Sequence, residues 1–526
     1  MASAAQPAGS AAGHPHQSDE AHLHADNYWL LIVGIMAASL LQILDTTIAN
    51  VAIPHMQASL GATIDSVTWV LTSYIIASAV ALPITGWLAD RIGARRLFIG
   101  SVAGFIFTSM LCGMAQNLEE MVIFRAMQGV AGAFIAPLSQ AFMLDITRPS
   151  RHAQVMAIWS MGIMIGPILG PILGGWLTES ANWRWVFYVN LPIGILSLAA
   201  LIAYLPQPEQ RRRPFDLTGF ILLAIALSGL QLMLDRGGHL DWFDATEIWI
   251  YALLALSAGW MVVIHLSTTK HPMFDTALFR DRYVAFAMLF MLVIGVVMFG
   301  TMALLPPMLQ NLFGYGVIDT GIVLMPRGIG ILISMQVSSW LMRRGWDARP
   351  VVAMGFLICG FSLWQMAHWS LAVDQFHIIA TGLTQGLGMG LVFIPLQVSA
   401  FATLAPRLRT EGSSLLNLFR SLGASVGIAL MTVLLGSNIQ TSHSVLAGHI
   451  TAATGSVIDV STIDRFQALG DMALRIMDAE VNRQAAMIAY INDFWLMMWI
   501  TIAAAPLAFF MRSNPHMQGK LPPPSK

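Results

Sequence analysis

Fourteen apolar stretches, each long enough to cross a lipid bilayer as a helix, constrain this chain more than any other sequence feature. A transmembrane helix needs about 20 predominantly apolar residues, because the hydrocarbon core is about 30 Å thick. The stretches are 28–51, 66–88, 97–115, 119–144, 154–177, 185–205, 216–234, 247–267, 283–305, 320–342, 350–370, 377–404, 412–436 and 491–511. Only 10% of the 526 residues are charged, against about a quarter in soluble proteins. The sequence therefore predicts an all-α polytopic protein embedded in a lipid bilayer.

The distribution of Lys and Arg predicts how the chain is oriented. Nineteen of the 27 basic residues fall in alternate connecting segments and in the C-terminal tail, and five fall in the opposite segments. Because cytoplasmic loops are enriched in basic residues, we expect fourteen spans with both termini in the cytoplasm. Residues 1–27 and 513–526 are then cytoplasmic tails, the first of them disordered. The net charge of −1 gives no reason to expect nucleic-acid binding.

An internal repeat divides the chain. Four segments recur in the same order after 253 to 261 residues: PHMQASLGATID and PMLQNLFGYGVID, GWLADRIGARR and SWLMRRGWDAR, QGVAGAFIAPLSQ and QGLGMGLVFIPLQ, SMGIMIG and SLGASVG. Parallel repeats of this kind are typical of alternating-access transporters. We therefore predict two six-helix halves in the same orientation, at 28–205 and 282–512, and a linker at 206–281 that carries two inserted helices. A polar segment on the outside, 437–490, belongs to the second half.

Two glycine-containing motifs stand at defined places in the first half. The first inner loop reads GWLADRIGARR, which we interpret as a tight turn of a cytoplasmic gate; its residues are Gly86, Asp90, Arg91, Gly93, Arg95 and Arg96. The fifth span reads GIMIGPILGPILGG, with glycine at every fourth position and prolines between; the motif residues are Gly162, Gly166, Pro167, Gly170, Pro171 and Gly174. Small residues at this spacing let another helix pack closely, and proline favours a bend.

These motifs, with LDTTIANVAIP, RAMQGVAGA and WRWVFYVNLPIG, resemble those of the major facilitator superfamily. The chain is most similar to its fourteen-helix drug–proton antiporters of the EmrB/QacA type, and closest to EmrB-type pump subunits. The resemblance covers about 28–512. It is weaker in SWLMRRGWDAR, the repeat of the first inner loop, where Arg343 aligns with Asp90. It implies a multidrug efflux pump of the bacterial inner membrane that works without a cofactor or a resident metal. It also implies a periplasmic EmrA-like adaptor and a TolC-like outer-membrane channel as partners, with 437–490 either as a docking element or without a special role.

Asp45 is a carboxylate inside the first apolar span. On a helix it shares one face with Gln42 and Thr46, and a polar stripe in a membrane helix points toward protein or water. Asp45 lies about six residues before the outer end of its span, and Arg125 lies about six residues into the fourth span from the same side. We therefore expect the two to be neighbours and Asp45 to take up and release the driving proton, since a carboxylate separated from its arginine in an apolar cavity is protonated. A static pair that fixes helix packing is the alternative.

Four polar residues are candidates for the substrate cavity: Gln42, Thr46, Gln128 and Arg327. Arg327 follows a proline inside its span, so it could instead bind exposed carbonyl groups. For Arg420 we favour a packing role. Asp145, near the inner end of the fourth span, is assigned to the cytoplasmic gate with Arg91. Many Met and Phe residues, 33 and 26 in all, suit a cavity that accepts varied hydrophobic compounds.

The predicted function is thus proton-coupled export of hydrophobic or amphipathic toxic compounds. A dedicated exporter of one metabolite, such as a siderophore or fatty acid, is an alternative within the transporters. A polytopic membrane enzyme is an alternative from another class, with Asp235, His239, Asp241 and Asp244 as the densest polar group near a membrane surface. The sequence has no phosphate-binding loop for ATP, which disfavours an ATP-driven pump.

Overall fold

The computed structural model describes residues 21–207, 214–238, 240, 242–270, 272–402, 404–449 and 471–511, and this part contains helices but no β-strand. Thirteen of its helical segments are long and apolar enough to cross a membrane. The predicted fifth span lies in α8 (His152–Ser180), whose 29 residues also exceed the about 20 needed. All fourteen predicted spans therefore coincide with helices. A helix satisfies the backbone hydrogen bonds within its own segment, which hydrocarbon cannot do.

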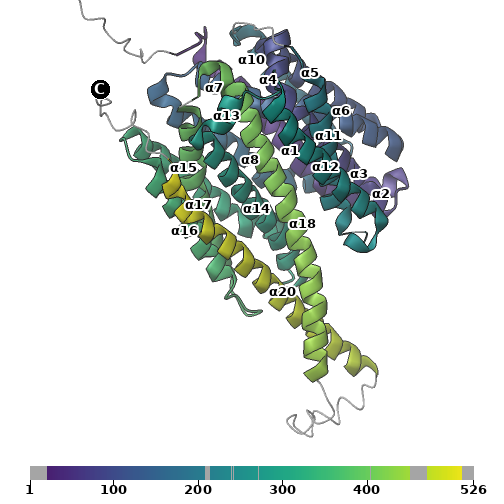
Figure 1. The fold of residues 1–526 in the computed structure, drawn as a ribbon. Coiled ribbons are helices and arrows are strands. Elements are labelled where there is room, and N and C mark those ends of the chain that lie inside the picture. The colour runs from purple at the N-terminus through teal and green to yellow at the C-terminus, as the bar shows by residue number, and fades with distance from the viewer. Residues whose placement is uncertain are drawn as a thin grey trace, which may run out of the picture.

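The first six predicted spans form the first half of the bundle (Figure 1). Three of these spans are interrupted, so that α3, α6 and α9 are followed by α4, α7 and α10. The elements are α1 (Tyr28–Leu60), α2 (Ile64–Val67), α3 (Trp69–Ala81), η1 (Leu82–Ile84), α4 (Thr85–Ile92), α5 (Ala94–Met114), α6 (Leu118–Ala133), α7 (Ile135–Asp145), η2 (Pro149–Arg151), α8, α9 (Trp185–Tyr188) and α10 (Asn190–Tyr204).

Two inserted helices and the second half follow. The elements are α11 (Leu217–Gly237), η3 (Trp242–Asp244), α12 (Thr246–Thr268), α13 (Thr276–Arg280), α14 (Arg282–Asn311), α15 (Val317–Arg343), α16 (Ala348–Met366), α17 (Gln375–Ala402), η4 (Pro406–Leu408), α18 (Arg409–His449), α20 (Asp471–Leu507) and η6 (Ala508–Phe510).

The packing of the helices repeats along with the sequence. In the first half α1 packs along α8, and α6 packs against both α3 and α5. In the second half α14 packs along α18, and α17 packs against both α15 and α16. Individual contacts correspond as well, since Gly166 lies against Ile43 and Gly427 lies against Val296, the residue 253 positions after Ile43. The internal repeat is therefore also a repeat of tertiary contacts.

The inserted helices α11 and α12 pack against each other at the side of the bundle, and α11 contacts both α3 and α18. On α12, large apolar side chains such as Trp249, Leu256 and Trp260 are exposed. An apolar surface of this kind is stable only against lipid, so α12 presents a lipid-facing side.

The two ends of the bundle differ. We call the end at which α1 begins and α20 ends the terminal face, and the opposite end the hairpin face. α18 has 41 residues, or about 62 Å at about 1.5 Å per residue, which is about twice the hydrocarbon thickness. Its far part and the start of α20 project beyond the other helices at the hairpin face (Figure 1).

Parts of two polar segments are ordered in the structure. Residues 437–449, predicted to lie outside the membrane, continue α18 as helix, and 471–490 belong to α20, where helical character was expected over 464–486; residues 450–470 lie outside the described part. Of the N-terminal tail, expected to be disordered, residues 21–27 are described, and the Leu23 N–H donates to the Asp145 carbonyl at 2.8 Å.

Candidate functional site

Asp45 and Arg125 form a buried ion pair in the first half. Asp45 lies on α1 and Arg125 on α6, and Arg125 Nη1 lies 2.7 Å from Asp45 Oδ2 with both side chains 0% exposed. The two residues that the sequence placed at similar depth are thus in contact. An ion pair so far from water is costly unless its remaining hydrogen-bonding groups are also satisfied.

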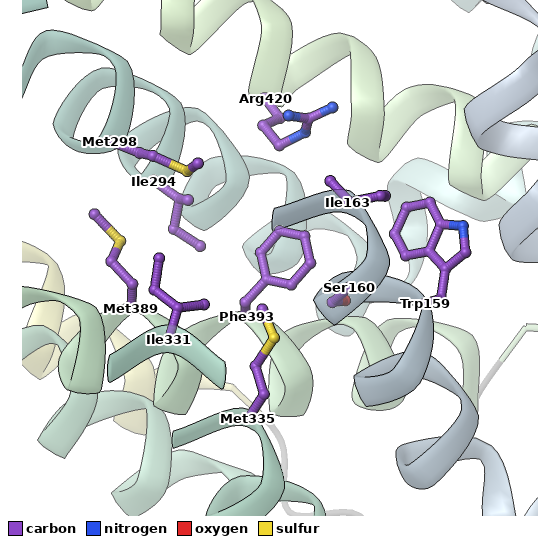
Figure 2. A pocket seen from close by; sticks show the side chains of 10 residues that line it. All are labelled: Trp159, Ser160, Ile163, Ile294, Met298, Ile331, Met335, Met389, Phe393 and Arg420. Carbon is purple, nitrogen blue, oxygen red and sulfur yellow. The ribbon is translucent and has the colours of Figure 1, made fainter. Parts of the chain in front are cut away.

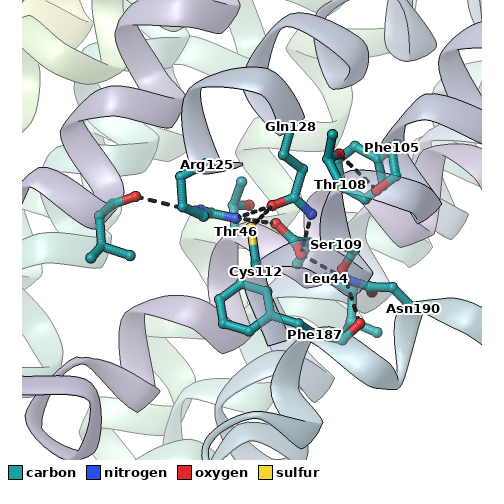
Figure 3. A network of polar contacts seen from close by, with 12 residues as sticks. Leu44, Thr46, Phe105, Thr108, Ser109, Cys112, Arg125, Gln128, Phe187 and Asn190 are labelled. Carbon is teal, nitrogen blue, oxygen red and sulfur yellow. Dashed lines mark hydrogen bonds and ion pairs between the residues drawn. The ribbon is translucent and has the colours of Figure 1, made fainter. Parts of the chain in front are cut away.

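Two carboxamides supply most of those hydrogen bonds. Gln128 Nε2 and Asn190 Nδ2 donate to Asp45 Oδ1 at 2.9 and 2.6 Å, and Arg125 Nη1 donates to Gln128 Oε1 at 2.8 Å. Asn190 Nδ2 also donates to Ser109 Oγ at 2.9 Å. The carboxylate is therefore held from α6, through Arg125 and Gln128, and from α10, through Asn190. Figure 3 shows these three side chains together with Ser109 of α5, which accepts from Asn190.

The assignment of Gln128 to the substrate cavity differs from its place in the structure. Its side chain is 0% exposed, and both of its amide atoms bind the ion pair. Asn190 was not among the predicted site residues, although it stands in WRWVFYVNLPIG. A polar side chain inside an apolar span signals a functional or packing role, and that signal could have identified Asn190.

Aromatic rings complete the surroundings of the guanidinium. Arg125 Cζ lies 4.5 Å from the centre of the Tyr74 ring and 5.7 Å from that of Phe187. Arg125 Nε donates to the Val70 carbonyl at 3.1 Å. Cation–π contacts strengthen when desolvated, so these rings and the Val70 carbonyl help to hold the buried guanidinium in place.

The other polar residues of the α1 stripe lie close by. Gln42 and Thr46 are both half-buried. Thr46 Oγ1 donates to the Ile43 carbonyl of its own helix at 2.8 Å, and Gln42 Oε1 has no hydrogen-bond partner among the described residues. A buried acceptor without a partner costs free energy, so Gln42 has an unused acceptor one turn from Asp45.

The glycine motif of α8 packs against α1, the helix that carries Asp45. Gly162 faces Met36, Gly166 faces Ile43, and Gly170 faces Thr47. Gly174 continues the same stripe against Ile48 and Val51, and Pro167 and Pro171 belong to the same helix. A Cβ on Gly166 would lie 3.4 Å from the Leu44 backbone nitrogen, so the glycines let α8 pack closely along the stretch of α1 that carries Asp45.

The two halves meet at the terminal face. Arg409 Nη1 of α18 lies 2.5 Å from Asp145 Oδ1 of α7, and Ser414 Oγ donates to the Leu82 carbonyl at 2.6 Å. Gln140 Oε1 accepts hydrogen bonds from Ser413 and from Asn417 of α18. Together these contacts close the bundle at that end.

Asp145, assigned to the cytoplasmic gate with Arg91, forms its ion pair with Arg409, and Arg91 is exposed. Sequence depth alone could not reveal an ion pair between the halves.

The remaining residues of the first inner loop, GWLADRIGARR, lie along α4 and at the start of α5. Gly93 joins α4 to α5 with a φ of 95° that favours glycine. A Cβ on Gly86 would lie 3.1 Å from Glu411 Cβ, so α4 packs directly on α18. Arg95 Nη2 donates to the Ile202 carbonyl at 2.7 Å. Asp90 is half-buried and Arg96 is exposed.

A central cavity lies between the halves (Figure 2). Its walls come from α8, α14, α15, α17 and α18; the lining residues are Trp159, Ser160, Ile163, Ile294, Met298, Ile331, Met335, Met389, Phe393 and Arg420. Three methionines and two aromatic rings provide an adaptable apolar surface. Arg420 lines this cavity, although the sequence favoured a packing role for it, and Arg327 does not.

Arg327 lies just outside the cavity. Its side chain is 8% exposed, and its Nη2 donates to the Met298 carbonyl at 3.2 Å. Of the two roles considered for Arg327, binding of an exposed carbonyl is thus observed. No group of His, Cys, Asp and Glu residues that could hold a metal ion occurs in the described part of the chain.

A multi-helix membrane bundle with two repeated halves, a central cavity and a buried ion pair defines a transporter. The chain belongs to the major facilitator superfamily, because the family model "Major Facilitator Superfamily" matches residues 35–428. It is therefore not an enzyme; of the polar group considered for that alternative, His239 and Asp241 lie outside the described residues.

Several curated relatives cover most of the chain. It is 33% identical over 93% of both chains to "Probable multidrug resistance protein EmrY" of Escherichia coli (strain K12). It is 35% identical to "Multidrug export protein EmrB" of Haemophilus influenzae, covering 80% of this chain and 83% of that one. It is 32% identical to "Fatty acid resistance protein FarB" of Neisseria gonorrhoeae, covering 92% and 96%. The human organic anion transporter MFSD10 shares the fold, with a TM-score of 0.55 at 13% identity over 90% and 99% of the two chains.

Proposed function

We propose that this transporter exports hydrophobic and amphipathic toxic compounds across the bacterial inner membrane in exchange for protons. The relatives named as multidrug export and resistance proteins support this function, at 33% and 35% identity. The apolar cavity between the halves, with its methionines and aromatic rings, supports a substrate range of varied shape. The observation that carries the proposal is the buried Asp45–Arg125 pair, because an ionisable pair inside a membrane bundle is costly and is retained for function.

Asp45 is the proposed proton carrier. Its carboxylate is fully buried and accepts hydrogen bonds from Arg125, Gln128 and Asn190, which offset the cost of holding a charge away from water. When α1 moves away from α6, the carboxylate loses its counter-ion and takes up a proton. Each charge that crosses a potential of 100 mV then supplies about 2.3 kcal/mol, which is sufficient to drive a substrate gradient.

The orientation follows from the basic residues. We place the terminal face and both termini in the cytoplasm, because Lys and Arg concentrate in the segments at that face. The contacts between Asp145 and Arg409 then close the cytoplasmic side, and the conformation described is open or occluded toward the outside. The divisions 28–205, 206–281 and 282–512 are the proposed domains, and the repeated helix pairs support them.

The projecting ends of α18 and α20 are the proposed docking element for a periplasmic adaptor. This end carries both polar groups, such as His443, whose Nε2 lies 3.1 Å from Asp478 Oδ1, and exposed apolar side chains, such as Val445 and Ile476. The adaptor would connect the transporter to an outer-membrane channel.

Transport in proteoliposomes tests the proposal. A susceptibility panel of cells with and without the protein first identifies an exported compound. An imposed pH gradient should then drive that compound across the membrane, and Asp45→Asn should reduce the rate at least tenfold. Asp374→Asn, a change at an exposed carboxylate between α16 and α17, is the matched control and should transport normally. Gradient-driven transport by Asp45→Asn at the normal rate, or export of no compound in the panel, would refute the proposal.

A dedicated exporter of one metabolite is the second candidate. The relative named as a fatty acid resistance protein favours it, at 32% identity over nearly the whole chain. The same panel separates the two, because a dedicated exporter protects against one chemical class only.

A further inference from the structure

The second half contains a counterpart of the ion-pair site from which the carboxylate is missing. By the offsets of the repeat, Met298 stands at the position of Asp45, Arg327 at that of Tyr74, and Gln385 at that of Gln128. The tertiary contacts agree with this alignment. A Cβ on Gly129 would collide with the Tyr74 carbonyl, and a Cβ on Gly386 would collide with the Arg327 carbonyl.

Arg327 brings a positive charge to this place without bringing a negative one. Among the described residues its guanidinium makes one hydrogen bond, to the Met298 carbonyl at 3.2 Å, and no carboxylate lies within ion-pair distance. A charge inside a membrane bundle that lacks a counter-ion is strongly unfavourable. The first half avoids this cost by pairing Arg125 with Asp45.

Gln385 is a second unsatisfied group at the same place. Its side chain is 0% exposed, and neither Oε1 nor Nε2 has a hydrogen-bond partner in the described part of the chain. Its counterpart Gln128 uses both atoms on the ion pair. A buried carboxamide without partners costs about 1–3 kcal/mol for each group left unpaired, so this site has both a free charge and a free donor.

The site borders the central cavity. Met298 lines the cavity with its side chain and accepts from Arg327 with its carbonyl. Ile331 and Met389, which also line the cavity, lie four residues after Arg327 and Gln385, which is one helical turn on the same face. Figure 2 shows the side chains of Met298, Met389 and Ile331 together at one side of the cavity.

From these observations we infer that the transporter binds amphipathic organic anions, with the carboxylate at Arg327 and Gln385 and the apolar body in the methionine-lined cavity. The carboxylate of the substrate takes the place that Asp45 occupies in the first half. It neutralises Arg327 and accepts from Gln385 Nε2, so binding satisfies both groups at once. The inference rests on the proposed function and specifies its substrate class.

Arg420 is the internal control for this assignment. It lines the cavity as well, but its Nη2 already donates to Asn417 Oδ1 at 3.2 Å. A cavity that recognised anions through Arg420 would bind them without Arg327. The two arginines therefore predict different results in one experiment.

Equilibrium binding of dodecanoate and of 1-dodecanol to the full-length protein in lipid nanodiscs tests the inference, with empty nanodiscs as the background. The two probes share an apolar chain and differ in charge. We expect Arg327→Gln to weaken dodecanoate binding at least tenfold and to leave dodecanol binding within threefold. Arg327→Lys should restore part of the dodecanoate affinity, because it retains the charge. Gln385→Leu should weaken dodecanoate binding more than dodecanol binding, and Arg420→Gln should affect both probes equally.

The inference is overturned if dodecanoate does not bind the unmodified protein, if Arg327→Gln lowers both affinities equally, or if only Arg420→Gln is selective for the anion. An unchanged thermal unfolding midpoint shows that each variant is folded. Binding is measured without a pH gradient, so its outcome is independent of proton coupling. Selective loss in Arg327→Gln together with a failed proteoliposome assay would leave the anion site intact and reject the proposed exchange with protons.

Discussion

Asp45 on α1 and Arg125 on α6 form their 2.7 Å ion pair within one half of the transporter. A rigid rocking of the two halves therefore leaves the pair intact. The pair separates only if α1 moves relative to α6 inside the first half. The helix along which α1 can move is α8, whose glycine stripe contacts α1 on both sides of Asp45. In the proposed exchange mechanism, α1 is therefore the element that would link proton uptake to alternating access.

Removing one partner of this pair should destabilise the protein. Arg125→Met leaves a buried carboxylate without its counter-ion, and such changes cost about 3–5 kcal/mol. We expect the thermal unfolding midpoint in detergent to fall by several degrees. The double variant Asp45→Leu with Arg125→Met should recover most of that loss. Equal midpoints for the single and double variants would contradict a stabilising pair.

Arg327→Met should have the opposite effect. Arg327 has no carboxylate partner among the described residues, so its removal relieves an uncompensated charge. We expect an unfolding midpoint at or above that of the unmodified protein. A fall as large as that of Arg125→Met would mean that Arg327 is paired in the folded state.

The glycine stripe should be sensitive to a single methyl group. A Cβ on Gly170 would collide with Thr47, whereas a Cβ on Gly175 of the same helix meets nothing within 4 Å. We expect Gly170→Ala to lower the transport rate at least tenfold by displacing α1. Gly175→Ala is the matched control and should transport normally. If both variants behave alike in proteoliposomes, close packing of α8 on α1 is not needed.

The ion pair at the terminal face should hold the halves together there. Asp145→Asn leaves Arg409 without its 2.5 Å partner, so conformations open at this face should gain population. Spin labels at the exposed positions Arg91 and Arg407, on either side of the closure, should report longer distances by pulsed electron resonance. Exchange of the charges, Asp145→Arg with Arg409→Asp, should restore the shorter distance. An unchanged distribution in Asp145→Asn would exclude a gating role.

Local sequence patterns were sufficient to predict the membrane-spanning helices of this fold and one contact of the site, the one between Asp45 and Arg125. Apolar length identified the spans, because lipid admits only helices. Spacing in Gly162–Gly174 identified a packing face, because a helix repeats every 3.6 residues. Equal depth of Asp45 and Arg125 predicted their proximity, since residues on adjacent spans at one level of a bundle can meet.

The amino-acid sequence by itself determined where the apolar spans lie, the two repeated halves and the presence of a charge pair in the first of them. Only the tertiary structure decided that Asn190 and Gln128 bind that pair, that Asp145 meets Arg409, and that Arg420 lines the cavity. The physical reason is the rotation of each helix about its axis and the approach of the two halves. Both depend on how all neighbouring side chains pack together, and no short stretch of sequence contains that information.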